Sequence, residues 1–457
     1  MITITDHKIC RLPENKIKAS ARINLADQQH QVSFTIEGSP VYEGIEPFLC
    51  LALLPAMAER LPIKLDLPVS PQLLSNLATV QGIFQTWDSQ LHRVPIYVPA
   101  NMAAPAGLAG KIKAGTGAFL GKLSKPGRVN QNGVACLFSG GVDSFYTLLK
   151  HLDEIDSLVF VSAGFDIYPH PDNREFRRTI CQRLRQVARQ LSKEFIEVEA
   201  DLQDFSDNYV SWGFYHGAAM AALAQLLANR FSKVYFASSY SYDDLVPWGS
   251  HPVLDHLWST EKVEIVHDGG EFIRLRKTGA IATSQIALDN LRVCLNYGQN
   301  RAYNCGECEK CIRTMVTLRG EGALERCPVF ARPLDLAALA VMPIPEYVLQ
   351  PWQDMLARIE GLGTDPELEL AVRQCVTNTL KGGSAKRMAL LEKKMAERHE
   401  LLKDMTAWAN SLEENNRNMN RGIADASQWG KSLEKELKKT TRPKLPGFLK
   451  RDKTAPF

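Results

Sequence analysis

A short loop rich in serine and glycine has the composition of a phosphate-binding site. Glycines let a backbone approach phosphate closely and adopt positive φ, and hydroxyl groups donate hydrogen bonds to phosphate oxygens. The free N–H groups at a helix start add attraction, because the helix dipole favours negative charge there. We therefore expect nucleotide binding by Ser139, Gly140, Gly141, Val142, Asp143 and Ser144.

An ordinary glycine turn is the alternative, but two serines and an aspartate in one hexapeptide favour the nucleotide. Asp143 is expected to orient the loop or to meet a magnesium ion rather than to contact bare phosphate. No Gly-Lys-Ser/Thr sequence follows the loop, which disfavours a kinase or GTPase of the P-loop type.

Four further residues have the spacing of metal ligands. The pattern is C-x10-C-x2-C-x2-C, formed by Cys294, Cys305, Cys308 and Cys311. Four thiolates are what a closed tetrahedral zinc site needs, so we expect structural Zn²⁺. An iron–sulfur cluster is the second interpretation, but no proline follows the last cysteine and Cys294 lies upstream. Unrelated buried thiols are the third interpretation of the pattern. The remaining cysteines of the chain are expected to be packed thiols: Cys10, Cys50, Cys136, Cys181, Cys327 and Cys375.

The elements that must position these residues begin near residue 133. Apolar runs at 134–138, 158–162, 195–198 and 233–237 alternate with helical segments. Continuous apolar runs are typical of strands buried on both faces, and the alternation predicts an α/β fold with a doubly wound parallel sheet. The phosphate loop would then follow the first of these strands and begin a helix.

At this junction the loop resembles the SGGxDS loop of PP-loop ATP pyrophosphatases, which have an adenine nucleotide alpha hydrolase-like fold. These proteins cleave ATP between the α and β phosphates, transfer AMP to a substrate oxygen, and then admit a nucleophile. The resemblance implies that the loop holds pyrophosphate. It also implies that the end of the second strand, at Gly164 and Phe165, lies against the adenine.

With the cysteines included, residues 133–319 resemble the 7-cyano-7-deazaguanine synthase family. That family adenylates a deazaguanine carboxylate, adds ammonia to give the amide, and continues to the nitrile. The resemblance implies ATP, Mg²⁺ and Zn²⁺ as cofactors, and a catalytic phosphate contact for Lys277 beside Asp143 and Ser144. A ligase that conjugates a deazaguanine-like group, a tRNA-type thiolation enzyme and a non-catalytic nucleotide-binding scaffold are the alternatives.

The loop between residues 238 and 252 departs from that family and leaves the substrate open. Trp248 and His251 are candidate substrate-binding residues, with a structured loop around a packed tryptophan as the other interpretation. His216 is expected to cap a helix or to be buried, Asp166 could bind ribose, and residues 267–270 predict a turn.

The chain divides into several segments by composition. We expect an N-terminal α+β unit at 1–125, the ATP-binding domain with its zinc site at 130–325, and a proline-interrupted helical segment at 326–382. Apolar heptads predict a coiled coil at 385–440, which would mediate homo-oligomerisation or docking to a partner helix. A basic tail at 441–457 follows.

The charge distribution and the N-terminal residues bear on possible partners and on the cellular compartment. Residues 381–457 hold 18 Lys and Arg against 10 Asp and Glu, whereas the rest holds 36 against 41. A basic tail could contact nucleic acid or anionic lipid, although a solvated charge run is the simpler interpretation. The first residues lack the apolar core of a signal peptide, which predicts a cytoplasmic protein with reduced thiols.

Overall fold

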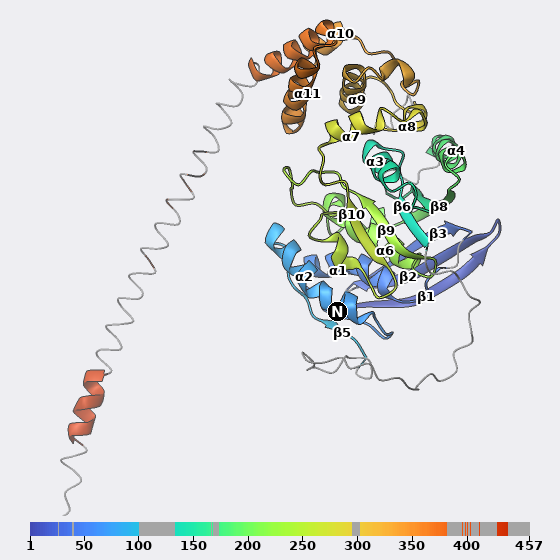
Figure 1. Ribbon diagram of the computed structural model, residues 1–457. Helices are drawn as coiled ribbons and strands as arrows, with labels where there is room; N and C mark the ends of the chain where they lie inside the picture. The colour runs from blue at the N-terminus through green and yellow to red at the C-terminus, as the bar shows by residue number, and fades with distance from the viewer. Residues whose placement is uncertain are drawn as a thin grey trace, which may run out of the picture. The chain divides into compact units, whose positions relative to one another are not determined.

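The computed structural model describes residues 1–25, 27–38, 41–99, 133–165, 167, 173–294 and 302–381 (Figure 1). It also describes residues 427–436 and the single residues Met395, Arg398, Glu400, Lys403 and Ser411. The chain forms two compact units, Met1–Val376 and Thr377–Phe457.

The first unit is built on a ten-stranded sheet with the strand order β10-β9-β6-β7-β8-β3-β2-β1-β4-β5. Five neighbouring strands are parallel to one another. They are β6 (Gly133–Leu137), β7 (Ser157–Ala163), β8 (Glu194–Asp201), β9 (Phe231–Ala237) and β10 (Glu264–Asp268). The predicted α/β class is confirmed, and the predicted apolar runs coincide with β6 to β9.

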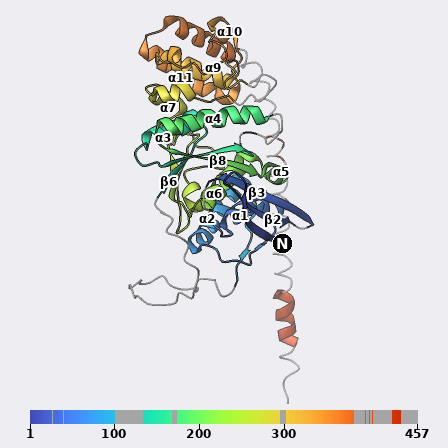
Figure 2. The ribbon, with the colours of Figure 1, turned by 90° about the vertical axis from the view of Figure 1, so that its right-hand side faces the viewer.

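Helices cover both faces of these parallel strands, as Figure 2 shows. In β7, Val159 and Val161 belong to one core, which includes α6 (Trp212–Leu226), whereas Leu158 and Phe160 belong to another. That second core includes the apolar faces of α3 (Val142–Lys150) and α4 (Arg174–Gln190). Side chains alternate along a strand, so burial on both faces requires apolar residues in succession.

The N-terminal residues extend the same sheet. A meander of β1 (Ile2–Leu12), β2 (Lys16–Leu25) and β3 (Gln28–Glu37) pairs through β3 with β8, antiparallel. The remaining elements are α1 (Glu46–Glu59), β4 (Ile63–Lys64), α2 (Pro71–Trp87) and β5 (Ile96–Tyr97). Residues 1–99 thus share a sheet and a core with the rest, rather than forming the unit of their own that the sequence predicted up to residue 125. The reason is that β3 covers the edge of β8, which would otherwise lie unpaired.

A helical layer follows β10 in the chain. It contains α7 (Arg274–Ile281), α8 (Gln285–Asn290), α9 (Glu309–Gly320), α10 (Leu336–Val341) and α11 (Leu349–Leu362). Helical residues 366–376 complete a third core with Val316 of α9 and the buried Trp352 of α11. Short helical turns occur at α5 (Gln203–Ser206), η3 (Asp255–Trp258), η4 (Leu324–Arg326) and η5 (Glu346–Val348).

In the second unit, residues 427–436 are helical and exposed, including Trp429 and Leu433. Most of the predicted coiled coil at 385–440 lies outside the described residues, as do the basic tail at 441–457 and the segment 100–132.

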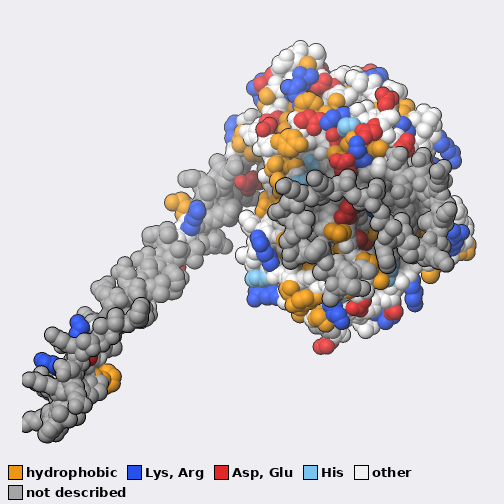
Figure 3. Space-filling view, turned by 60° about the horizontal axis from the view of Figure 1, so that its bottom comes forward, with side chains coloured by type: hydrophobic (Ala, Val, Ile, Leu, Met, Phe, Trp, Pro, Cys, Tyr) orange, Lys and Arg blue, Asp and Glu red, His pale blue; other side chains and the backbone are white. Residues whose placement is uncertain are grey.

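Lys, Arg, Asp and Glu side chains are interspersed on the face of the molecule shown in Figure 3. Within the described ranges, every helix is too short or too polar to cross a bilayer.

Candidate active site and metal centre

The serine–glycine loop lies between β6 and α3, where the sequence predicted it. Gly140 has a φ of +74°, and a Cβ there would come within 2.7 Å of Leu184 Cδ2. Gly141 precedes α3 with an extended backbone, so it is the N-cap residue of that helix. Both the positive φ and the close packing require glycine at position 140. The result is a narrow loop whose backbone leads directly into a helix N-terminus.

The two serine hydroxyls of the loop lie together at this helix start. Ser139 Oγ and Ser144 Oγ are 3.4 Å apart, and the Gly141 N–H donates to Ser139 Oγ over 3.3 Å. Ser144 Oγ donates to the Gly141 carbonyl over 3.1 Å, while the Arg292 N–H donates to the Gly140 carbonyl over 2.8 Å. These bonds give the loop a defined shape, with polar hydrogens gathered at the positive end of the α3 dipole.

Two cations from α7 hold the aspartate of the loop. Asp143 Oδ2 accepts a hydrogen bond from Arg274, and Asp143 Oδ1 lies 3.3 Å from Lys277 Nζ. Lys277 is only 1% exposed, and its ammonium also donates to the carbonyl of Ser238, directly after β9, over 2.6 Å. Lysine is almost never buried this completely without anionic or carbonyl partners. The loop therefore has a fixed positive charge beside it.

The sequence analysis predicts a role for Lys277 but not for Arg274. The signal was present, because residues three apart lie on one face of a helix. Arg274 and Lys277 have this spacing, so a helix that presents one to the loop also presents the other.

The predicted adenine-contacting residues end the neighbouring strand. Gly164 follows β7 with a φ of +90°, and Phe165 packs edge-on against Trp212 at 5.5 Å between ring centroids. Because β6 and β7 are parallel neighbours, Gly164 and the phosphate loop lie at the same, carboxyl edge of the sheet. Ligands of α/β sheets bind at this edge. Asp166 lies outside the described residues.

Replacing Gly164 by Ala should destabilise the protein strongly. The new Cβ would lie 1.9 Å from the Ala200 carbonyl oxygen, in a backbone conformation that side chains rarely adopt. We expect a loss of about 3 kcal/mol or more in the free energy of unfolding, measured by urea titration. Gly361→Ala in α11 is the matched control, since its Cβ would meet open space and should stabilise by up to about 1 kcal/mol. Equal stability of both variants would contradict the packing described here.

Trp248 and His251 contact aromatic side chains of neighbouring helices, and His251 is buried. His251 contacts Trp87 at 5.0 Å between centroids, and burial lowers its pKa, with the nearby His267 adding to the effect. Trp248 lies against His216 at 5.2 Å. His216 Nδ1 is 3.0 Å from the Trp212 carbonyl oxygen, and its Nε2 accepts from the Ser250 N–H. These contacts support the structured-loop interpretation and a structural role for His216.

A buried polar cluster near this loop was missed by sequence reasoning. Asp255 is fully buried and accepts hydrogen bonds from Ser250 Oγ at 2.7 Å and from the His251 N–H at 3.1 Å. His267 Nδ1 lies 2.7 Å from the same carboxylate. His267 belongs to β10, so the turn predicted at 267–270 begins only at Gly269, whose φ is +89°. The cluster joins η3 and the loop before it to β10, with Asp255 and His267 12 positions apart in the chain.

Asp268, the last residue of β10, holds α3 in place through hydrogen bonds. Its carboxylate accepts hydrogen bonds from Thr147 at 2.8 Å and from Lys150 and His151 at 2.9 Å. Burial opposes ionisation, but the bonds from His151, Lys150 and Thr147 outweigh it and lower the pKa of Asp268. The helix that begins with the phosphate loop is thereby held on the sheet.

Asp268→Asn should cost about 2 kcal/mol of stability at pH 7, because three hydrogen bonds lose their ionised acceptor. A lowered pKa means that this contribution is present above the ordinary carboxyl pKa and is lost as the pH falls through the folded-state value. The difference in unfolding free energy between wild type and variant should therefore shrink as the pH falls below the ordinary carboxyl pKa, as measured by urea unfolding. The exposed Asp243→Asn is the control, and a gap independent of pH would contradict the assignment.

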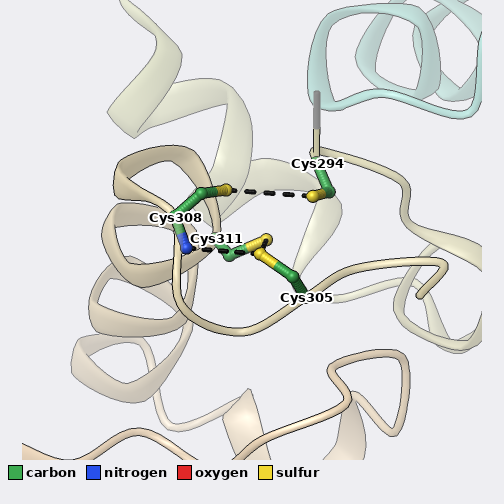
Figure 4. Close-up of side chains that lie close together, drawn as sticks. All are labelled: Cys294, Cys305, Cys308 and Cys311. Atoms are coloured by element: carbon green, nitrogen blue, oxygen red, sulfur yellow. Dashed lines mark hydrogen bonds between the residues drawn. The ribbon is translucent and has the colours of Figure 1, made fainter. Parts of the chain in front are cut away.

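The four predicted metal ligands come together in one cluster (Figure 4). Their sulfur atoms all lie within 4.8 Å of one another; Cys294 and Cys308 are 3.9 Å apart, as are Cys305 and Cys311. Zn–S bonds of about 2.3 Å in a tetrahedron place sulfurs about 3.8 Å apart. The donor set therefore fits a zinc ion in size and in chemistry.

The local backbone explains the cluster. Gly306 has a φ of +76°, and a Cβ there would lie 2.8 Å from the Arg332 carbonyl oxygen, so the turn needs glycine. The Cys308 N–H donates to Cys305 Sγ over 3.3 Å. Cys308 is the N-cap of α9 and Cys311 lies in its first turn, so a bound metal would fix the start of that helix. Of the other six cysteines, five are buried as predicted, whereas Cys10 is exposed because it lies near the end of β1.

The structure thus brings the serine–glycine loop and Lys277 together, and separately gathers the four cysteines. No family model, curated protein or solved structure matches the chain.

Proposed function

We propose that the chain is an enzyme of the PP-loop ATP pyrophosphatase type that adenylates a carboxylate, such as that of a deazaguanine-like compound. A carboxylate oxygen attacks the α-phosphorus of ATP, and the bond to the β-phosphate oxygen breaks to release pyrophosphate. Ammonia or an amine then attacks the acyl carbon and releases AMP. The observation that carries the proposal is the loop at the start of α3, with Arg274 and Lys277 beside it.

The position of the loop in the sheet supports nucleotide binding. The chain passes from β6 outward to β7 and β8, and β9 and β10 then lie on the other side of β6. In doubly wound sheets, ligands bind at the carboxyl edge where the strand order reverses. The serine–glycine loop follows β6 and so lies at this point of reversal.

The loop and its cations suit a leaving pyrophosphate. Backbone N–H groups at the start of α3, with the hydroxyls of Ser139 and Ser144, would hold the β and γ phosphates. Lys277 and Arg274 would neutralise the charge that develops on the pyrophosphate as its bond to the α-phosphorus lengthens. Asp143 keeps both cations aimed at the loop. Preorganised charge of this kind lowers the barrier because little rearrangement is needed during the reaction.

Two metals complete the proposal. Magnesium binds through one or two carboxylates together with substrate phosphates, so Asp143 and the triphosphate oxygens would hold it jointly. Zinc at the four cysteines would be structural, because four protein ligands leave no open coordination position. The chemistry that Mg²⁺ supplies is charge neutralisation of the phosphates.

Carboxylate-dependent exchange of radiolabelled pyrophosphate into ATP tests the proposal. The metal-loaded protein would be assayed with a panel of carboxylic acids that includes deazaguanine carboxylates. Exchange that requires both ATP and one acid supports adenylation. Nucleotide binding without exchange for any acid in the panel would favour the non-catalytic scaffold instead.

A further inference from the structure

One short backbone segment, residues 290–294, joins the serine–glycine loop to the cysteine cluster. The Arg292 N–H donates to the Gly140 carbonyl over 2.8 Å, and a Cβ on Gly141 would lie 3.6 Å from the Arg292 carbonyl oxygen. Two residues further along the chain, Cys294 is one of the four candidate metal ligands. The segment therefore contacts the loop through Arg292 and contributes to the cluster through Cys294.

The side chain of Asn304 fixes the position of this segment. Its Oδ1 accepts hydrogen bonds from the Val293 N–H over 2.8 Å and from the Cys294 N–H over 3.1 Å. Its Nδ2 donates to the carbonyls of Leu291 over 2.7 Å and Val329 over 3.3 Å, and the residue is fully buried. These bonds use both donor hydrogens and both lone pairs of the amide. A buried amide is costly unless its bonds are made, so it favours a single arrangement of the backbone around it.

Asn304 and its neighbour Tyr303 lie directly before a metal ligand, Cys305. The Tyr303 hydroxyl donates to the Asn290 carbonyl over 2.6 Å, and that carbonyl oxygen would lie 3.7 Å from a Cβ on Gly140. Cys294 lies on one of the two chain segments that Asn304 bridges, and Cys305 lies on the other. A metal held by both cysteines would therefore add its bonds to the same junction.

We propose that Asn304 and Tyr303 are positioning residues through which a metal at the four cysteines sets the shape of the serine–glycine loop, so that metal and polyphosphate bind cooperatively. The inference rests on the proposed function and adds a dependence between its two sites. Both ligands need the same arrangement of residues 290–294, so the ligand that binds second finds this arrangement already made. By thermodynamic linkage, each ligand raises the affinity for the other by the same factor.

Zinc occupancy of the full chain, measured at free zinc concentrations fixed by a metal buffer, tests the proposal. Saturating magnesium pyrophosphate should raise the zinc affinity about tenfold. Calorimetry should show that zinc raises the affinity for pyrophosphate by the same factor, at a temperature where circular dichroism shows the metal-free chain to be folded. Equal pyrophosphate affinity of the zinc-loaded and metal-free chains would overturn the proposal. Absence of both pyrophosphate and ATP binding by the zinc-loaded chain would instead overturn the proposed function.

Asn304→Ala should reduce this linkage to less than about twofold, because the junction loses all four hydrogen bonds of the side chain. Gln225→Ala is the matched control, since it removes another fully buried amide, one that donates from α6 to the Trp258 carbonyl in the first core. The control should lower stability but keep the full linkage. Two ligands that were coupled only through the stability of the whole fold would stay coupled in both variants, and that result would overturn the assignment of Asn304.

Tyr303→Phe is a milder variant that tests the same junction even where Asn304→Ala fails to fold. It removes only the hydroxyl that donates to the Asn290 carbonyl. Zinc should bind with the stoichiometry of the wild type, while the linkage should fall by about twofold or more. An unchanged linkage in this variant would overturn the assignment of Tyr303.

Discussion

Asp143→Asn should lower carboxylate-dependent exchange of pyrophosphate into ATP by about 100- to 1,000-fold. The amide is nearly the same size as the carboxylate but carries no charge. Arg274 and Lys277 would lose the anion that aims them at the loop, and the loop would lose its contact to magnesium. Transition-state stabilisation that depends on preorganised charge falls steeply when one such group is removed.

The fold should survive this substitution. Lys277 keeps its hydrogen bond to the Ser238 carbonyl, and Arg274 is partly exposed to solvent. Asp153→Asn, at an exposed position soon after α3, is the matched control and should retain full exchange. Circular dichroism would show that both variants are folded. Exchange at the wild-type rate by Asp143→Asn would remove Asp143 from the mechanism.

Cys308→Ser should abolish stoichiometric zinc binding and destabilise the first unit. A structural zinc site contributes its binding free energy to folding, because the unfolded chain does not hold the ligands together. Removing the ion would release the N-terminus of α9, which packs against α7 and α11. We expect the thermal midpoint to fall by about 5 to 10 °C, and treatment of the wild type with a strong chelator to have the same effect.

Cys327→Ser is the control that distinguishes the effect of losing the metal from the effect of losing a buried thiol. Cys327 is buried in the same core as the cluster and donates to the Leu288 carbonyl over 3.1 Å, a bond that a serine hydroxyl can keep. This variant should bind zinc normally by elemental analysis. Full zinc occupancy in Cys308→Ser would show that the cluster is not a four-thiolate site.

Local patterns predicted the parts of the structure that depend on neighbouring residues. The apolar runs indicated β6 to β9 because a doubly covered strand has no polar face, and the spacing of the cysteines indicated the cluster because a short turn brings sulfurs together. The serine–glycine loop between β6 and α3 is likewise contained in six consecutive residues. Each of these signals lies within one short segment.

Features that depend on distant pairing could not be predicted in this way. The pairing of β3 with β8 joins residues more than 150 positions apart, and hydrogen bonds between backbones carry no residue-type signal. The Glu309–Trp352 contact, between residues 43 positions apart, also arises only when the fold is complete. For the same reason the contact of His251 with Trp87 of α2 and that of Trp248 with His216 of α6 could not be predicted.

The central claim is that the Ser139–Ser144 loop binds a triphosphate, and calorimetric titration of MgATP into the metal-loaded full chain measures it most directly. We expect saturable binding of one nucleotide per chain, with a dissociation constant between about 1 μM and 1 mM, and competition by inorganic pyrophosphate. No saturable heat up to millimolar ATP, with the metal bound and the protein folded, would contradict it.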